Sequence, residues 1–112
     1  MRHILTSVVL VVLLFSSLAS GETVKWGDLI VREDLHYKKL TDVPFTGKIT
    51  GEFQGKLKNG KKEGPWVVYH DNGQLMSKGT YKDGKEEGPW VYYHYNGQLR
   101  SKGTYKDGKK VK

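Results

Sequence analysis

The stretch Gly64–Glu87 reads GPWVVYHDNGQLMSKGTYKDGKEE, and Gly88–Lys110 directly after it reads GPWVYYHYNGQLRSKGTYKDGKK. The second text is nearly a copy of the first, shifted by 24 residues. A fixed period of this length is typical of repeat arrays, in which each unit buries its apolar face only by stacking on its neighbours. Upstream, Gly55–Lys61 falls in the same register, and Phe45–Leu57 resembles a degenerate copy. The chain is therefore predicted to be a repeat array.

Turn signals predict the structure of each repeat. Asn72-Gly73 and Asn96-Gly97 stand between extended runs, and Asn-Gly is a strong signal for a two-residue type I′ hairpin turn. Asp83-Gly84 and its equivalents supply the alternate turns. Strands of about six residues between such turns leave no room for a helix. The sequence predicts an all-β fold, an elongated single-layer antiparallel β-meander built from 24-residue hairpin repeats.

A two-residue turn also predicts which residues face each other. It places His70 opposite Leu75, and Trp66 opposite Gly79, where the indole would lie across bare backbone. Because side chains alternate along a strand, one face then carries an aromatic row. The glycines expected at structural positions of the repeat, in its turns or just before its tryptophan strands, are Gly64, Gly73, Gly84, Gly88, Gly97 and Gly108.

The chain is expected to divide into three parts. Residues 1–20 have the layout of a signal peptide: a basic start, an apolar run at Ile4–Leu14, and small residues before a cleavage site near Ala19 to Gly21. The apolar run is shorter than the roughly 20 residues of a transmembrane helix, although a retained N-terminal anchor is the alternative. Residues 21–44 form a segment of short strands, and residues 45–112 form the repeat domain, with repeats at 45–63, 64–87 and 88–112.

The predicted leader, the absence of cysteine and the net charge limit where the protein can act and what it can bind. The predicted leader implies an exported protein, periplasmic or secreted, and the absence of cysteine excludes a lipoprotein and any disulfide framework. The formal net charge of +7 favours an acidic partner, unless the lysines only form a solvated surface.

The sequence offers no catalytic or metal-binding constellation. His70 and His94 occupy equivalent positions two strands apart, about 9–10 Å at the spacing of neighbouring strands, which is too far for one zinc ion. The acidic pair Glu86-Glu87 lies at a turn, and the glycines follow a hairpin period rather than a phosphate-binding loop. We therefore predict a protein that is not an enzyme and that uses no metal or cofactor.

The text YKDGKxxGPWxxYHxNGQL at Tyr81–Leu99 resembles the MORN repeat, in the short bacterial variant found in YwqK-type antitoxin family proteins. The resemblance implies one hairpin per repeat, stacked into a twisted sheet, and an interaction module without catalytic residues. It also implies an antitoxin or immunity role as one hypothesis.

The main functional hypothesis is an exported scaffolding module that binds an unknown protein partner. The alternatives are peripheral binding to an anionic membrane or envelope polyanion, and the antitoxin role; nucleic acid is not expected as a partner. The last strand, Ser101–Lys106, is expected to leave an open edge through which the chain self-associates. The aromatic row is either a stabilising layer or the binding face, or both, and consists of Trp66, Tyr81, Trp90, Tyr92 and Tyr105.

Overall fold

A computed structural model describes residues 22–111 of the chain. The predicted signal peptide at residues 1–20 lies outside the described residues. The elements are β1 (Thr23–Lys25), the 3-10 turn η1 (Trp26–Asp28), β2 (Leu29–Arg32), β3 (Leu35–Lys38), β4 (Gly47–Thr50), β5 (Phe53–Lys58), β6 (Lys61–Tyr69), β7 (Leu75–Lys82), β8 (Lys85–Tyr93), β9 (Leu99–Lys106) and β10 (Lys109–Val111).

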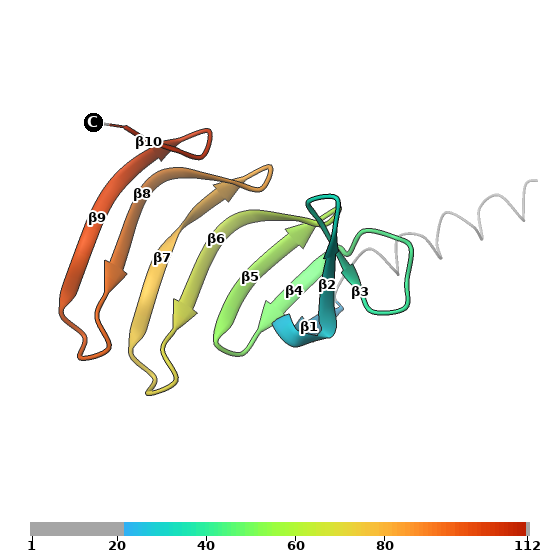
Figure 1. The fold of residues 1–112 in the computed structure, drawn as a ribbon, viewed down its shortest axis with the longest axis horizontal. Helices are drawn as coiled ribbons and strands as arrows, with labels where there is room; N and C mark the ends of the chain where they lie inside the picture. Colours follow the sequence, from blue (N-terminus) through green and yellow to red (C-terminus); the bar gives the residue numbers. More distant parts are fainter. Residues whose placement is uncertain (1–21, 112) are drawn as a thin grey trace, which may run out of the picture.

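One curved sheet contains eight of these strands, in the order β1-β4-β5-β6-β7-β8-β9-β10. From β4 to β10 every neighbouring pair is antiparallel and follows the chain (Figure 1), so the predicted all-β meander is confirmed. One feature differs from the prediction, because β1 pairs in parallel with β4. β2 and β3 form a separate two-stranded sheet within the segment of residues 21–44 for which short strands were predicted.

Two-residue type I′ turns occur at the Asn59-Gly60, Asp83-Gly84 and Asp107-Gly108 positions. In each, both residues have positive φ, for example 52° at Asp83 and 82° at Gly84. The flanking lysines pair directly, as in Lys82 with Lys85. Asp and Asn tolerate this backbone conformation and glycine adopts it freely, which explains why these dipeptides recur there.

The prediction of a type I′ turn at Asn72-Gly73 is wrong. The Gly73 N–H donates to the His70 carbonyl at 3.0 Å, and the His70 N–H donates to the Gln74 carbonyl at 2.8 Å. This pattern defines a three-residue loop, a type I turn followed by glycine at φ +88°. The Asn72 side chain favours it, because its oxygen accepts the Gln74 N–H at 3.0 Å. The Asn96-Gly97 turn repeats the same bonds.

The longer loop changes the register only near its tip. Tyr69, not His70, pairs with Leu75, and a bulge then restores the expected pairing of Trp66 with Gly79. The bulge absorbs the additional loop residue, so the register predicted for the centre of the hairpin is correct although the turn type is not.

The last predicted edge is only partly open. β10 pairs with the end of β9, joining Lys110 to Tyr105 and Val111 to Thr104. Among the described residues, no strand pairs with the outer side of β9 at residues 99–103. The expectation of a fully open edge over Ser101–Lys106 is therefore wrong.

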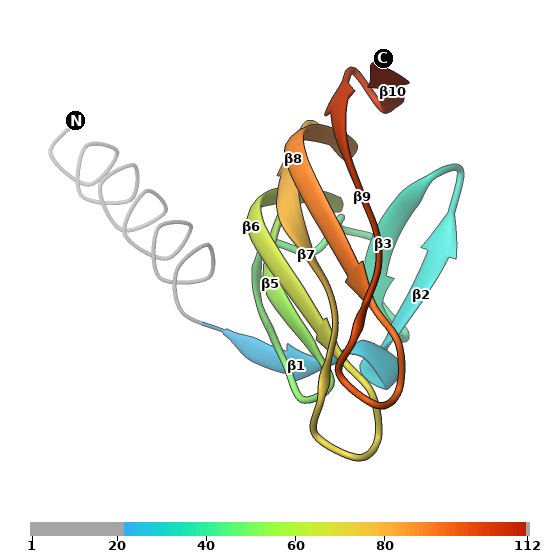
Figure 2. The same cartoon turned by 90° about the vertical axis from the view of Figure 1, so that its left-hand side faces the viewer.

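A compact core lies at the N-terminal end of the sheet. Phe45, Ile49, Leu57 and Trp66 are buried together, and the N-terminal segment adds Val24, Trp26 and Leu29 around them. Figure 2 shows the β2–β3 hairpin standing beside one face of the large sheet. The segment before the repeats thus covers the first end of the array, a role that the repeat pattern did not predict.

Within residues 22–111, no helix has the length and apolar character needed to cross a membrane.

Candidate interaction surfaces

Strand register divides the large sheet into two chemically different faces. Directly paired residues share a face, and successive residues alternate between faces. We call the face that carries the tryptophans the aromatic face. From β6 to β10 its residues include Lys62, Trp66, Val68, Ser77, Gly79, Tyr81, Glu86, Trp90, Tyr92, Ser101, Gly103, Tyr105 and Lys110.

Each tryptophan of this face lies over a glycine of the preceding strand. Trp66 on β6 covers Gly55 on β5, where an added Cβ would lie closer than 3.0 Å to the indole. The indole Nε1–H donates to the Lys56 carbonyl at 3.1 Å. The prediction that the ring lies across Gly79 is therefore wrong, although Trp66 and Gly79 are paired in the ladder.

A bulge explains why the Trp66 ring points towards β5 and not towards Gly79 on β7. Gly64 has φ +80°, Pro65 lacks a backbone N–H, and the β5–β6 register shifts between Gln54 and Lys56. The ladder is interrupted there, and the Lys56 carbonyl accepts the indole N–H. Glycine leaves the space that the ring fills.

The same packing recurs one repeat later. Trp90 lies over Gly79 and donates its Nε1–H to the Thr80 carbonyl at 3.2 Å. The exposed fractions of the Trp66 and Trp90 side chains are only 2% and 4%. In a thin sheet, these two indoles supply much of the buried apolar surface.

The five residues predicted to form the aromatic row are brought together as one continuous ladder. The ring centroids are separated by 6.1 Å for Trp66–Tyr81, 5.0 Å for Tyr81–Trp90, 6.1 Å for Trp90–Tyr92 and 6.4 Å for Trp90–Tyr105. Three of these four contacts are edge-to-face, a favoured geometry for aromatic pairs. Since the tryptophans are buried and the tyrosines half-buried, the surface that a partner can touch is mainly tyrosine.

Trp26 and Lys62, which the sequence analysis did not single out, complete the N-terminal end of the ladder. Trp26 stacks on Phe53 at 5.4 Å and meets Trp66 edge-on at 5.8 Å. The Lys62 ammonium lies 5.2 Å, 5.4 Å and 4.8 Å from the ring centroids of Trp26, Trp66 and Tyr81. Burial lowers the pKa of Lys62, and the negative charge of Glu86 opposes that shift.

The tyrosine hydroxyls of the ladder lie in an environment that resists ionisation. Burial raises the pKa of Tyr92 to about 12, with further contributions from the Tyr105 hydroxyl and the Glu86 carboxylate. Burial and Glu86 also raise the pKa of Tyr81. Both phenols therefore stay neutral at physiological pH, so they offer hydrogen-bond donors beside apolar rings.

The opposite face is rich in lysine, and we call it the lysine face. Ten exposed lysines lie on it: Lys48, Lys56, Lys58, Lys61, Lys78, Lys82, Lys85, Lys102, Lys106 and Lys109. By contrast, four charged residues reach the aromatic face between β6 and β10: Lys62, Glu86, Lys110 and Arg100, whose guanidinium lies 5.6 Å from the centroid of the Tyr92 ring. The excess positive charge is therefore concentrated on one side of the sheet.

The lysine face also carries Glu63 and Glu87, which support the turns. Their Oε1 atoms accept the backbone N–H groups of Asp83 at 3.0 Å and Asp107 at 3.3 Å. The salt bridges of residues 22–111 join Arg32 to Asp42 and Lys38 to Glu22, away from this face. The ten lysines thus have no carboxylate partner within the described part of the chain.

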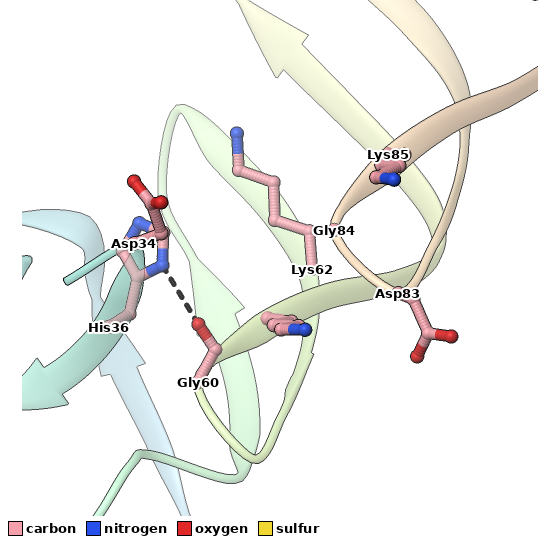
Figure 3. Close-up of a pocket in the computed structure, with 8 residues that line it drawn as sticks. Asp34, His36, Gly60, Lys62, Asp83, Gly84 and Lys85 are labelled. Carbon is pink, nitrogen blue, oxygen red and sulfur yellow. Dashed lines mark hydrogen bonds between the residues drawn. The ribbon is translucent and has the colours of Figure 1, made fainter. Parts of the chain in front are cut away.

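A shallow pocket of about 350 Å³ lies where three turns meet (Figure 3). Its lining residues are Asp34, His36, Gly60, Lys61, Lys62, Asp83, Gly84 and Lys85. The His36 Nδ1 contacts the Gly60 carbonyl at 3.0 Å, which ties the N-terminal segment to the first repeat turn. Acidic and basic side chains both line the pocket, and its histidine contacts a backbone carbonyl. These features indicate a structural contact between the N-terminal segment and the repeat turns, and not a ligand site.

The repeated histidines are not equivalent in the structure. His70 reaches the next hairpin, with Nε2 3.0 Å from the Tyr93 carbonyl and its ring 5.4 Å from that of Tyr95. The expectation that it packs on Leu75 is wrong, because the three-residue loop moves it out of the ladder. His94 is exposed. Across residues 22–111, no three histidine or acidic side chains are grouped closely enough to hold a metal ion.

Comparison with known families agrees with this geometry. Residues 62–83 and 86–107 match the family model described as a MORN repeat variant. The chain contains two MORN repeats. Repeats of this family are generally modules that bind proteins or membranes, and they are not catalytic. No curated protein and no solved structure matches the chain.

Each MORN repeat docks on its predecessor at the turns as well as through the indole. The Gly84 N–H donates to the Lys62 carbonyl at 2.9 Å, and the Gly108 N–H donates to the Glu86 carbonyl at 3.0 Å. At the other ends of the strands, the Asn72 side chain donates to the Tyr95 carbonyl, and the Tyr95 hydroxyl donates to Asp71. The repeat positions that are most noticeable in the sequence are therefore used to assemble the sheet.

Proposed function

We propose that this MORN-repeat protein is a non-enzymatic scaffolding module that binds a protein partner on its aromatic face. The observation that supports this proposal most strongly is the continuous ladder of five aromatic rings on a face with few charged residues. Clustered aromatic side chains with neutral hydroxyl groups are typical of protein-binding surfaces, where the ring supplies apolar contact and the hydroxyl a hydrogen bond.

The half-buried tyrosines are the contact residues in this proposal. Trp66 and Trp90 are almost completely covered, so they position the surface without being available to a partner. Tyr92 and Tyr105 flank the covered Trp90 ring at 6.1 Å and 6.4 Å and remain partly exposed. Replacing a tryptophan would test the fold, whereas replacing these tyrosines tests binding.

The test compares partner capture by the wild type, the double variant Tyr92→Ser/Tyr105→Ser, and Tyr93→Ser. Tyr93 is a matched control because it is also half-buried and follows Tyr92 directly in β8. The proposal expects specific partners to be lost from the double variant and kept by the control. Identical partner lists from all three proteins would refute docking on the aromatic face.

A second candidate function is peripheral binding to an anionic membrane or envelope polyanion through the lysine face. The observation that favours it is the segregation of ten exposed lysines with no ion-pair partner in the described residues. Basic residues near an anionic leaflet contribute about 1 kcal/mol each, and salt screens the attraction over about 8 Å at physiological ionic strength.

Vesicle sedimentation tests this candidate. Lys78→Glu/Lys102→Glu reverses two charges at the centre of the lysine face, and Lys39→Glu/Lys110→Glu makes the same charge change at exposed positions elsewhere. Binding to anionic vesicles should weaken more for the first pair and should fall steeply with salt. Equal binding by both double variants, or binding that salt does not change, would count against the lysine face.

We also propose that the protein acts after export, since the leader pattern at residues 1–20 supports a periplasmic or secreted location. Sequencing the N-terminus of the mature protein should give a start between residues 20 and 22. An intact Met1 on protein recovered from the cytoplasm would refute export. The antitoxin hypothesis stays a prediction, as does the link to the YwqK-type family.

A further inference from the structure

We propose that the outer edge of β9 binds an extended Pro-Trp segment of another protein chain, with the indole of that segment lying over Gly103. The inference rests on the proposed interaction role, because it names one class of partner and the place where it binds. The segment would add a strand beside β9, in line with β10, so that backbone hydrogen bonds supply affinity and the indole supplies specificity.

The first evidence is that the chain itself fills the equivalent place twice. A tryptophan from the following strand covers Gly55 in one repeat and Gly79 in the next. Each indole N–H donates to the carbonyl of the residue after that glycine, Lys56 or Thr80. Gly103 is the third member of this series, and the hexapeptide GTYKDG at Gly79–Gly84 recurs unchanged at Gly103–Gly108.

The second evidence is what lies over Gly103. A Cβ added there would meet the far end of the Lys110 side chain, with Cε at 2.6 Å and Nζ at 3.4 Å. Lys110 is exposed and belongs to the three-residue strand β10. A flexible lysine side chain can move aside at little cost, whereas the indoles over Gly55 and Gly79 are fixed by burial.

The third evidence is the incomplete surroundings of Tyr105. Its equivalent Tyr81 has a tryptophan on each side, with centroids at 6.1 Å for Trp66 and 5.0 Å for Trp90. Tyr105 contacts Trp90 at 6.4 Å, and no second tryptophan of residues 22–111 meets it. An indole over Gly103 would give Tyr105 the two tryptophan neighbours that Tyr81 has.

The backbone beside this position is also available. β10 pairs with Thr104–Lys106, and in the described chain no strand pairs with the outer side of Leu99–Gly103. Leu99 is 52% exposed. A strand that binds here would cover unpaired N–H and C=O groups, which are otherwise a template for non-specific association.

The experiment measures binding of a capped synthetic peptide, GPWVVYH, whose sequence is that of Gly64–His70. Calorimetry compares the wild type with Gly103→Ala and Lys110→Ala, and a second peptide carries alanine in place of tryptophan. A Cβ on Gly103 occupies the volume of the incoming ring, so Gly103→Ala should weaken binding about tenfold or more. Lys110→Ala removes the side chain that covers the glycine, so it should bind as well as the wild type or more tightly.

Three calorimetric results would each overturn the inference: equal affinity of the wild type and Gly103→Ala, equal affinity of the two peptides, or no binding of the tryptophan peptide to the wild type. A dimer that persists in Gly103→Ala would show that the edge pairs with a second copy without an indole, and would also overturn it. If the tyrosine variants lose their captured partners while the peptide fails to bind, this inference fails and the proposed docking on the aromatic face stands.

Discussion

Replacing Gly79 by alanine should destabilise the sheet far more than the same replacement at Gly103. The two residues occupy equivalent positions in identical local sequence, so their strand propensity is the same. At Gly79 the new methyl group would lie closer than 3.0 Å to the Trp90 ring, whose exposed fraction is 4%. At Gly103 it would meet only the mobile end of Lys110. The comparison therefore isolates the contact between indole and glycine.

The expected magnitude follows from how the ring can respond. Forcing additional volume into a packed site costs about 1–3 kcal/mol, and complete expulsion of the ring would approach the roughly 3–5 kcal/mol of a buried Trp→Ala replacement. Alanine offsets part of this cost, since glycine in a strand is less favourable by about 0.5–1 kcal/mol. We expect a net loss of about 2 kcal/mol for Gly79→Ala, and a change within about 0.5 kcal/mol for Gly103→Ala.

The assay is equilibrium unfolding in urea, followed by tryptophan fluorescence and by far-ultraviolet circular dichroism. With a urea dependence of about 1–2 kcal/mol per molar, the midpoint of Gly79→Ala should fall by about 1–2 M. Gly55→Ala should behave in the same way because its neighbour is Trp66. If Gly79→Ala and Gly103→Ala unfold at the same urea concentration, the indoles do not pack as described.

Three further predictions concern the ladder, its turns and its first end. Tyr92→Phe should remove an ionisation near pH 12 from the alkaline absorbance titration. Because folding raises the pKa of Tyr92 from 10.0, the stability linked to its protonation is present below pH 10 and is lost as the pH rises towards 12. A wild type in which every tyrosine titrates near 10 would contradict this prediction. Gly84 has φ +82°, so Gly84→Ala should lower the free energy of unfolding by about 1 kcal/mol. Gly27 has open space around it and no positive φ, so Gly27→Ala should leave the free energy of unfolding unchanged. Equal effects of the two substitutions would refute the assigned turn. Trp26→Ala should cost about 2–3 kcal/mol in the same urea assay, and an unchanged midpoint would show that the N-terminal segment does not stabilise the array.

The repeat text was sufficient to predict the fold because each repeat carries its own turn signals. Regular glycines and alternating apolar residues specify antiparallel pairing locally, so the register of Trp66 with Gly79 could be predicted without knowledge of the rest of the chain. The same reasoning grouped the five aromatic residues correctly on one face.

Features that depend on competition between local and longer-range contacts could not be predicted. The pattern Asn-Gly fits both a two-residue and a three-residue loop, and the Asn72 side chain decides in favour of the second through its bond to Gln74. Pairing alone placed the Trp66 ring over its ladder partner, whereas the bulge at Gly64-Pro65 directs it over Gly55.

The packing of the N-terminal segment against the ladder was missed for a different reason. Trp26 and Lys62 meet the ladder from outside the repeat pattern, and Lys62 stands where the next repeat has Glu86. Periodicity finds only what recurs. The departure from the repeat at Lys62 was the one available signal of a special contact. The contact distance between Tyr105 and Trp90 needed the ring positions of the structure.

The central claim is that buried indoles lie over bare glycine backbone at Gly55 and Gly79, while Gly103 is left for a partner. Proton NMR tests it most directly, because protons beneath an aromatic ring are shifted upfield by its ring current. The account predicts strongly upfield Hα resonances for Gly55 and Gly79 and an ordinary resonance for Gly103, since their neighbours are Trp66, Trp90 and Lys110 respectively. Matching Hα shifts at Gly79 and Gly103 would contradict it.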